Sequence, residues 1–88
     1  MNPFQNLISS LNKYGLVEDA RWIKEYYSET AYTTSSEMYG KLGVIIGKTY
    51  NYIPVEAQKF LASEFQDCEA IIKGVWGNYT LHGEHREL

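Results

Sequence analysis

The sequence predicts an all-α fold, in which residues 1–88 form one domain built as a small antiparallel bundle of about four helices. Apolar residues recur every three or four positions over most of the chain, which is the spacing of one face of a helix. Proline and glycine stand where such stretches begin and end. With 88 residues, of which 44% are hydrophobic, the chain can bury one core but not two.

The first helix is predicted to begin after Asn2, which can cap it with Pro3 at its first position. Polar residues fill the face opposite to one apolar stripe. Gly15 can end the helix, because glycine readily adopts the left-handed conformation found after a helix C-terminus. The stripe consists of Phe4, Leu7, Ile8 and Leu11.

A second helix is predicted from about residue 17 to residue 28. Glu18 and Asp19 lie near its start, where the helix dipole favours acidic side chains. Only a short break at Gly15 separates it from the first helix, so the two should form an antiparallel hairpin. Its apolar stripe contains Leu16, Ala20, Ile23 and Tyr27.

Serine and threonine dominate residues 28–36, which favours a loop. Thr34 and Glu37 have the spacing of a capping box, so a third helix is predicted to begin there and to end before Pro54. Residues 42–52 are also rich in β-forming side chains, and a strand is the alternative for this segment. A helix is favoured, because it places three glycines in one groove that another helix can approach closely. These are Gly40, Gly43 and Gly47.

A fourth helix is predicted from Pro54 to Gly74 or Gly77, and at about five turns it is the longest element. The residues after Trp76 are polar and show neither a helical nor an alternating pattern. We therefore expect a C-terminal tail over residues 77–88 that is flexible or loosely docked. The apolar stripe of this helix contains Ala57, Leu61, Phe65, Cys68, Ile72 and Val75.

Residue types that perform catalysis or bind metal ions are few. Cys68 lies on an apolar stripe, where a thiol that packs as a small hydrophobic group is more typical than a nucleophile. His82 and His85 lack the further Cys or Asp ligands of a metal site. The glycines match no nucleotide-binding motif. The sequence therefore predicts a protein that is not an enzyme and that holds no cofactor or metal.

The net charge is −3, from eleven acidic and eight basic residues, and no cluster of lysine or arginine occurs. This balance argues against direct nucleic-acid binding. The longest apolar run, Val44–Ile46, is too short to span a membrane, and the first residues lack the pattern of a signal peptide. A single cysteine allows no internal disulfide. The expected location is the cytoplasm.

Tyrosine is unusually frequent, with eight residues. It is enriched at protein-binding surfaces, because its ring buries a large area while its hydroxyl keeps a hydrogen bond. About half of these tyrosines should serve the edge of the core. The others, with an off-stripe tryptophan and nearby glutamates, predict an acidic and aromatic patch that binds a protein partner. The candidate residues are Trp22, Glu25, Glu29, Tyr32, Glu37, Tyr39, Tyr50 and Tyr52.

The run Ala20–Lys24 leads to the segment Glu37–Gly43 in a small acidic domain with many tyrosines. In this general character the chain resembles the small helical immunity proteins of bacterial toxin systems. The resemblance implies a cytoplasmic inhibitor that binds one cognate toxin domain, such as a nuclease with a basic surface, and blocks its active site. It carries no family signature, so it assigns no role to any residue.

Two other functions remain open. The glycine-lined face of the third helix could join two copies of the chain, which would make the protein a self-associating adaptor. A small enzyme could use Cys68 if His82 or His85 lay beside it in space. Trp22 could equally fill a gap between helices instead of meeting a partner.

Overall fold

The fold is taken from a computed structural model, which describes residues 2–29 and 35–82. No strand occurs in these two ranges, so the all-α prediction is confirmed and residues 42–52 are helical. Five helices follow one another: α1 (Pro3–Tyr14), α2 (Val17–Glu29), α3 (Ser35–Tyr52), α4 (Val55–Phe60) and α5 (Ala62–Val75).

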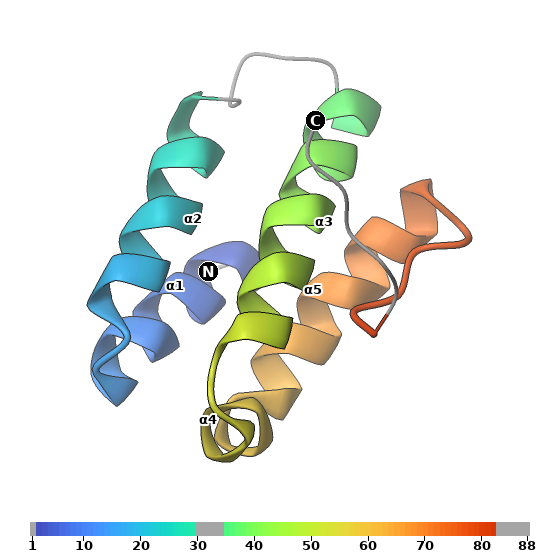
Figure 1. Cartoon of the computed structure of the whole chain (residues 1–88). Coiled ribbons are helices and arrows are strands. Elements are labelled where there is room, and N and C mark those ends of the chain that lie inside the picture. The colour runs from blue at the N-terminus through green and yellow to red at the C-terminus, as the bar shows by residue number, and fades with distance from the viewer. Residues whose placement is uncertain (1, 30–34, 83–88) are drawn as a thin grey trace.

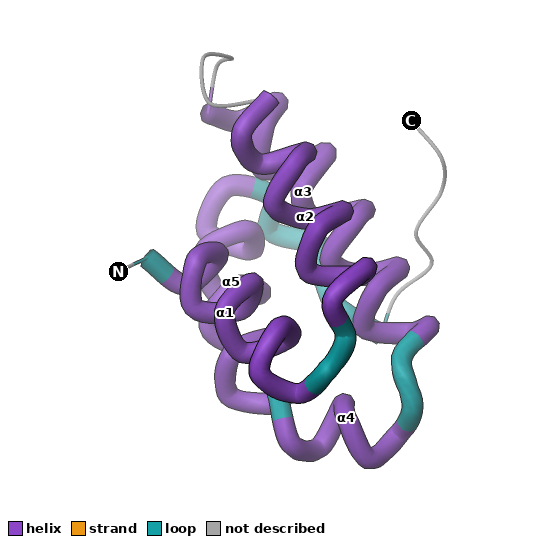
Figure 2. Tube along the Cα trace, turned by 90° about the vertical axis from the view of Figure 1, so that its left-hand side faces the viewer, coloured by secondary structure: helices purple, strands orange, loops and turns teal. Residues whose placement is uncertain are grey.

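Four of the helices form a closed ring around one core (Figures 1 and 2). Around this ring, α1 packs against α2, α2 against α3, α3 against α5, and α5 against α1. The short α4 lies across the lower end of the ring in Figure 1 and packs against α5. The radius of gyration, 11.8 Å, is close to the ~12 Å typical of a compact domain of this length. The bundle of four helices is therefore confirmed, with an added helix at one end.

The core lies inside this ring and consists of the predicted apolar stripes. Phe65, Leu7 and Ile23 are among its largest fully buried side chains. Thr49 on α3 is the one polar side chain among the buried residues described, and its hydroxyl has no hydrogen-bond partner there. The stripes of the first, second and fourth predicted helices thus meet as their spacing indicated, except that Val75, the last residue of the fourth stripe, is 43% exposed.

The two ends of α1 follow local rules. The Asn2 side chain accepts a hydrogen bond from the Gln5 N–H at 2.9 Å, and Pro3 is the first helical residue. At the other end Gly15 has φ 100°, and the Leu16 N–H donates to the Leu11 carbonyl at 2.9 Å. This is a Schellman-type end, which reverses the chain into α2. The predicted cap, stop and hairpin are confirmed.

The predicted fourth helix is divided in two, which the apolar period did not reveal. Leu61 has φ −101° and ψ 13°, outside the helical range, and separates α4 from α5. The N–H groups of Leu61 and Phe65 still donate to the carbonyls of Ala57 and Leu61, at 2.9 and 3.0 Å. Because these hydrogen bonds persist, the apolar spacing continues through the kink. The longest helix is α3, with 18 residues, and not the fourth predicted one.

The C-terminal segment (residues 76–82) packs against the bundle, beside α5 in Figure 1. Leu81 is 2% exposed, its N–H donates to a Glu69 carboxylate oxygen at 2.9 Å, and its carbonyl accepts from the Asn51 amide at 2.8 Å. The Tyr79 hydroxyl donates to the Gly43 carbonyl at 2.7 Å. Of the two alternatives for the tail, residues 77–82 are docked on the bundle, and residues 83–88 lie outside the described range.

Candidate functional site

Helix α2 carries two predicted patch residues on its outer face. Trp22 is 44% exposed and Glu25 is exposed, three residues later. Glu18, also exposed, precedes Trp22 by four residues, so the three side chains follow one line along the helix. We call Glu18, Trp22 and Glu25 the α2 ridge. Trp22 does not fill a gap between helices.

Two further predicted residues cannot be placed on this ridge. Glu29 is the last residue of α2, and its side chain lies outside the described part of the structure. Tyr32 falls in residues 30–34, which are also outside it.

Glu37, the single acidic residue of α3, lies in its first turn and is exposed, but it is not a free charge. The Lys41 ammonium lies 3.9 Å from its carboxylate, one turn along the same helix. An exposed pair of this kind is worth only ~0.3–0.5 kcal/mol. It nevertheless neutralises part of the charge that the sequence assigned to a binding patch.

Tyr39 and Tyr50 belong to the edge of the core. The Tyr39 ring stacks on Phe4, with ring centres 5.9 Å apart. Tyr50 meets Phe65 edge-on at 5.0 Å and His82 at 5.2 Å. Both are partly buried, so they stabilise the packing of α3 and do not add to the α2 ridge.

Tyr52 is the most exposed large hydrophobic residue described, at 81%. It ends α3, and fifteen residues separate it from Glu37 near the start of that helix. At 1.5 Å per residue this places the two ~22 Å apart along the helix axis. The predicted patch is therefore not one continuous site.

Sequence reasoning missed a second set of exposed apolar residues, at the end of the bundle where α1 turns into α2 and where α4 connects α3 to α5. Figures 1 and 2 show these connections at the same end of the molecule. Tyr14 and Phe60 stack there, with ring centres 5.1 Å apart, and remain 37% and 69% exposed. The kink at Leu61 is what turns α4 away from the line of α5, and it left no signal in the apolar period. We call this set the apolar end surface: Tyr14, Val17, Tyr52, Val55 and Phe60.

The glycine-lined face of α3 is covered by the chain itself. A Cβ atom added to Gly40 would lie 3.3 Å from the Trp76 ring, and one added to Gly43 would lie 2.8 Å from the Tyr79 ring. The close approach that the glycines indicated is confirmed: Ile72 of α5 would lie 3.2 Å from a Cβ at Gly43, and the C-terminal segment covers the rest of this face. A second copy of the chain could use this face only by displacing it.

The cysteine and the histidines were the candidates for a catalytic role. Cys68 is fully buried, and its thiol donates to the Pro3 carbonyl at 3.4 Å. Burial, followed by the nearby carboxylates of Asp67 and Glu64, raises the pKa of the Cys68 thiol to about 12, so it is not a nucleophile near neutral pH. His82 packs against Tyr50, and His85 lies outside the described residues.

Two other groups have shifted pKa values. Burial also raises the pKa of Tyr79, with a smaller contribution from the Glu69 carboxylate. The pKa of Asp19 is raised as well, by partial burial and by its neighbour Glu18. No three His, Cys, Asp or Glu side chains come together as a metal site in the part of the chain that is described.

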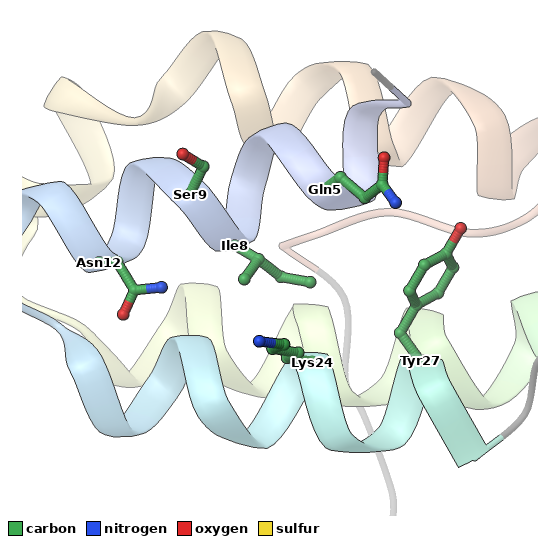
Figure 3. Close-up of a pocket in the computed structure, with 6 residues that line it drawn as sticks. All are labelled: Gln5, Ile8, Ser9, Asn12, Lys24 and Tyr27. Carbon is green, nitrogen blue, oxygen red and sulfur yellow. The ribbon is translucent and has the colours of Figure 1, made fainter.

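A shallow polar groove lies between α1 and α2 (Figure 3). Its volume is about 360 Å³, and its only charged group is the Lys24 ammonium. Ile8 forms its apolar floor, and Tyr27 closes one end. The groove is open to solvent and contains no buried polar group. The other residues that line it are Gln5, Ser9 and Asn12.

None of the described helices has the length and apolar character needed to cross a membrane. No protein-family model, curated protein or solved structure is similar enough to this chain to count as a match.

Proposed function

We propose that this chain is an immunity-type protein, which binds one cognate toxin domain through the α2 ridge and blocks its active site. The observation that carries the proposal is the exposed tryptophan at the centre of the ridge. Trp22 leaves 44% of its surface uncovered and is flanked by Glu18 and Glu25 along the same line of α2. A protein–protein complex of this kind needs no chemistry from the inhibitor, and it would form in the cytoplasm.

An exposed tryptophan is well suited to anchor such a complex. Tryptophan is among the residues most enriched at binding hot spots, because one ring desolvates a large area. Exposed carboxylates beside it can attract a basic partner over the last ~10 Å before contact and fix the orientation of the complex. The ridge and the net charge of −3 therefore favour a basic toxin domain, such as a nuclease, as the partner.

The alternative function, a self-associating adaptor, requires the glycine-lined face of α3 to be open, and this face is covered. Trp76 and Tyr79 already fill the space above Gly40 and Gly43. Self-association through that face would have to break the Tyr79–Gly43 hydrogen bond of 2.7 Å and expose both rings. We therefore do not retain it as the second candidate.

The proposal predicts that a toxin domain is encoded beside this gene, and that domain is the partner with which to test it. Expression of that domain alone should stop bacterial growth, and co-expression of this chain should restore it. Trp22→Ala should weaken the complex measured by calorimetry at least ~30-fold, which corresponds to a hot spot of ~2 kcal/mol. Val75→Ala, at an equally exposed apolar residue on α5, is the matched control and should bind as the wild type does.

The charges are tested in the same assay. Glu25→Lys should slow association and make it less sensitive to salt, because it removes attraction to a basic partner. Asp67→Lys changes the same charge on an exposed site of α5 and should have a smaller effect. Full neutralisation of the toxin by a folded Trp22→Ala, Glu25→Lys double variant would remove this assignment.

A further inference from the structure

The apolar end surface has an exposure that an isolated small domain rarely shows. Tyr52, Phe60 and Val55 are 81%, 69% and 63% exposed, although each is large and apolar. Scattered apolar residues on a surface are ordinary, but contiguous apolar patches mark places where another molecule binds. Here the Tyr14–Phe60 stack joins the end of α1 to the end of α4. Val17 begins α2, Tyr52 ends α3 and Val55 begins α4, so all the exposed groups lie at the same end of the bundle (Figure 1).

The area of this surface is that of a small interface. Aromatic side chains bury ~150–250 Å² each, so the exposed fractions of Tyr14, Tyr52 and Phe60 amount to roughly 300–450 Å² in one copy. Two such surfaces face to face would cover at most roughly 600–900 Å² from the rings alone. Val17, Val55 and the lysine stems bring the total close to the ~1,000 Å² at which specific interfaces begin. A weak association is expected from this area.

The charges around the surface are balanced, unlike those of the whole chain. Lys13 precedes Tyr14, Glu18 follows Val17, Glu56 follows Val55, and Lys59 precedes Phe60; all eight side chains are exposed. The rim thus carries two positive and two negative charges, whereas the chain as a whole carries −3. A strongly basic or acidic partner would gain nothing from such a rim. Two copies would not repel each other, and a two-fold arrangement lets lysines of one face glutamates of the other.

We infer that the apolar end surface is a self-association site, through which two copies of this chain form a weak two-fold dimer. The dimer buries the Tyr14–Phe60 stack and Tyr52 of both copies, and Lys59 of each copy faces Glu56 of the other. This surface lies at the end of the bundle, while Trp22 and Glu25 lie along the outer face of α2. Dimer formation therefore leaves most of the α2 ridge uncovered, and it does not depend on a toxin partner.

Sedimentation velocity of the pure 88-residue chain tests the inference. The monomer mass is 10.2 kDa, and the weight-average mass should rise toward twice this value from about 10 µM to about 1 mM, the range of weak complexes. Phe60→Asp places an uncompensated charge in the centre of the surface and should keep the protein monomeric. Val75→Asp adds the same charge at an exposed site on α5 and should dimerise as the wild type does.

Charge-reversal variants test whether the molecule that binds the apolar end surface is a second copy of this chain. Lys59→Glu leaves the rim with one positive and three negative charges, and Glu56→Lys leaves it with the reverse, so each variant alone should dimerise more weakly than the wild type. An equimolar mixture should recover association, because the two altered rims are complementary. A monomer at 1 mM overturns the inference, as does equal dimerisation of Phe60→Asp and Val75→Asp. Failure of the mixture to associate more strongly than its components also overturns it.

Discussion

The addition of a single methyl group at Gly43 should destabilise the folded protein. An added Cβ would lie 2.8 Å from the Tyr79 ring and 3.2 Å from Ile72 Cγ2. The ring cannot shift freely, because its hydroxyl donates to the carbonyl of Gly43 itself. Gly43→Ala should therefore lower the free energy of unfolding by about 1–2 kcal/mol, since crowding outweighs the ~0.5–1 kcal/mol that alanine gains within a helix. The melting temperature should fall by roughly 4–8 °C per kcal/mol.

Gly74→Ala is the control for this prediction. Gly74 lies within α5, and no atom comes within 4 Å of the position of its Cβ. Alanine there should raise the free energy of unfolding by ~0.5–1 kcal/mol. Two variants with equal stability would show that Tyr79 does not pack against Gly43 as described.

Cys68 makes the stability sensitive to alkaline pH. Burial raises the pKa of its thiol from 9.0 to about 12, so the folded state favours the protonated thiol. The stabilisation is complete below pH 9 and is lost as the pH rises toward 12, by up to ~1.4 kcal/mol per pH unit. Urea unfolding should show a clear loss of stability between pH 8 and pH 10.

Cys68→Ala separates this effect from the titration of other groups. The variant loses packing at every pH, but its stability should change less between pH 8 and pH 10 than that of the wild type. The native thiol should also resist alkylation at pH 8 and react once the protein unfolds. Parallel pH profiles of the two proteins would contradict the assignment.

The helices differ in how much of each could be predicted from sequence. The limits of α1 were predictable because Asn2, Pro3 and Gly15 act on their own backbone or on that of close neighbours. The kink at Leu61 was not, because hydrogen bonds and apolar spacing continue through it. The position of α4 depends instead on tertiary contacts: Ala57 is fully buried in the core, and the Gln58 side chain donates to the Tyr50 carbonyl at 2.6 Å.

The candidate site could be predicted only where one face of a helix is clearly polar. On α2 the apolar stripe is narrow, so Trp22 was recognised as lying off it, and it is exposed. On α3 the run Val44–Ile46 leaves the buried face ambiguous, and spacing did not show that Tyr39 and Tyr50 pack at the edge of the core while Tyr52 is exposed. Whether a tyrosine of α3 is buried or exposed depends on the helices that surround α3. The sequence of α3 alone does not contain this information.

The C-terminal segment should contribute to global stability although it is not helical. Leu81 is 2% exposed and is held by Glu69 and Asn51. Leu81→Ala should lower the free energy of unfolding by about 2 kcal/mol or more, the range for buried leucines. Asn78→Ala, at an exposed position of the same segment, should have little effect. Chemical unfolding followed by circular dichroism gives both values, and equal stability would mean that the segment is only loosely attached.

At the scale of the whole molecule, the ring of helices predicts a single cooperative transition. Each of α1, α2, α3 and α5 packs against two others of this set around one core. If one of these helices unfolded, the buried apolar residues of its neighbours would be exposed to water. The C-terminal segment should unfold in the same transition, because Trp76 and Tyr79 fill the glycine-lined face of α3. Small domains with one core ordinarily unfold in a two-state manner.

Trp76 can report on this transition by its fluorescence. Trp22→Phe leaves it as the only tryptophan, and because Trp22 is half exposed the variant should keep its fold. The unfolding midpoint from Trp76 emission should then coincide with that of helix content from circular dichroism. Emission that changes at a lower denaturant concentration would show that the segment detaches first. In that case the glycine-lined face of α3 would become uncovered while the helices remain folded, and self-association through that face would become possible again.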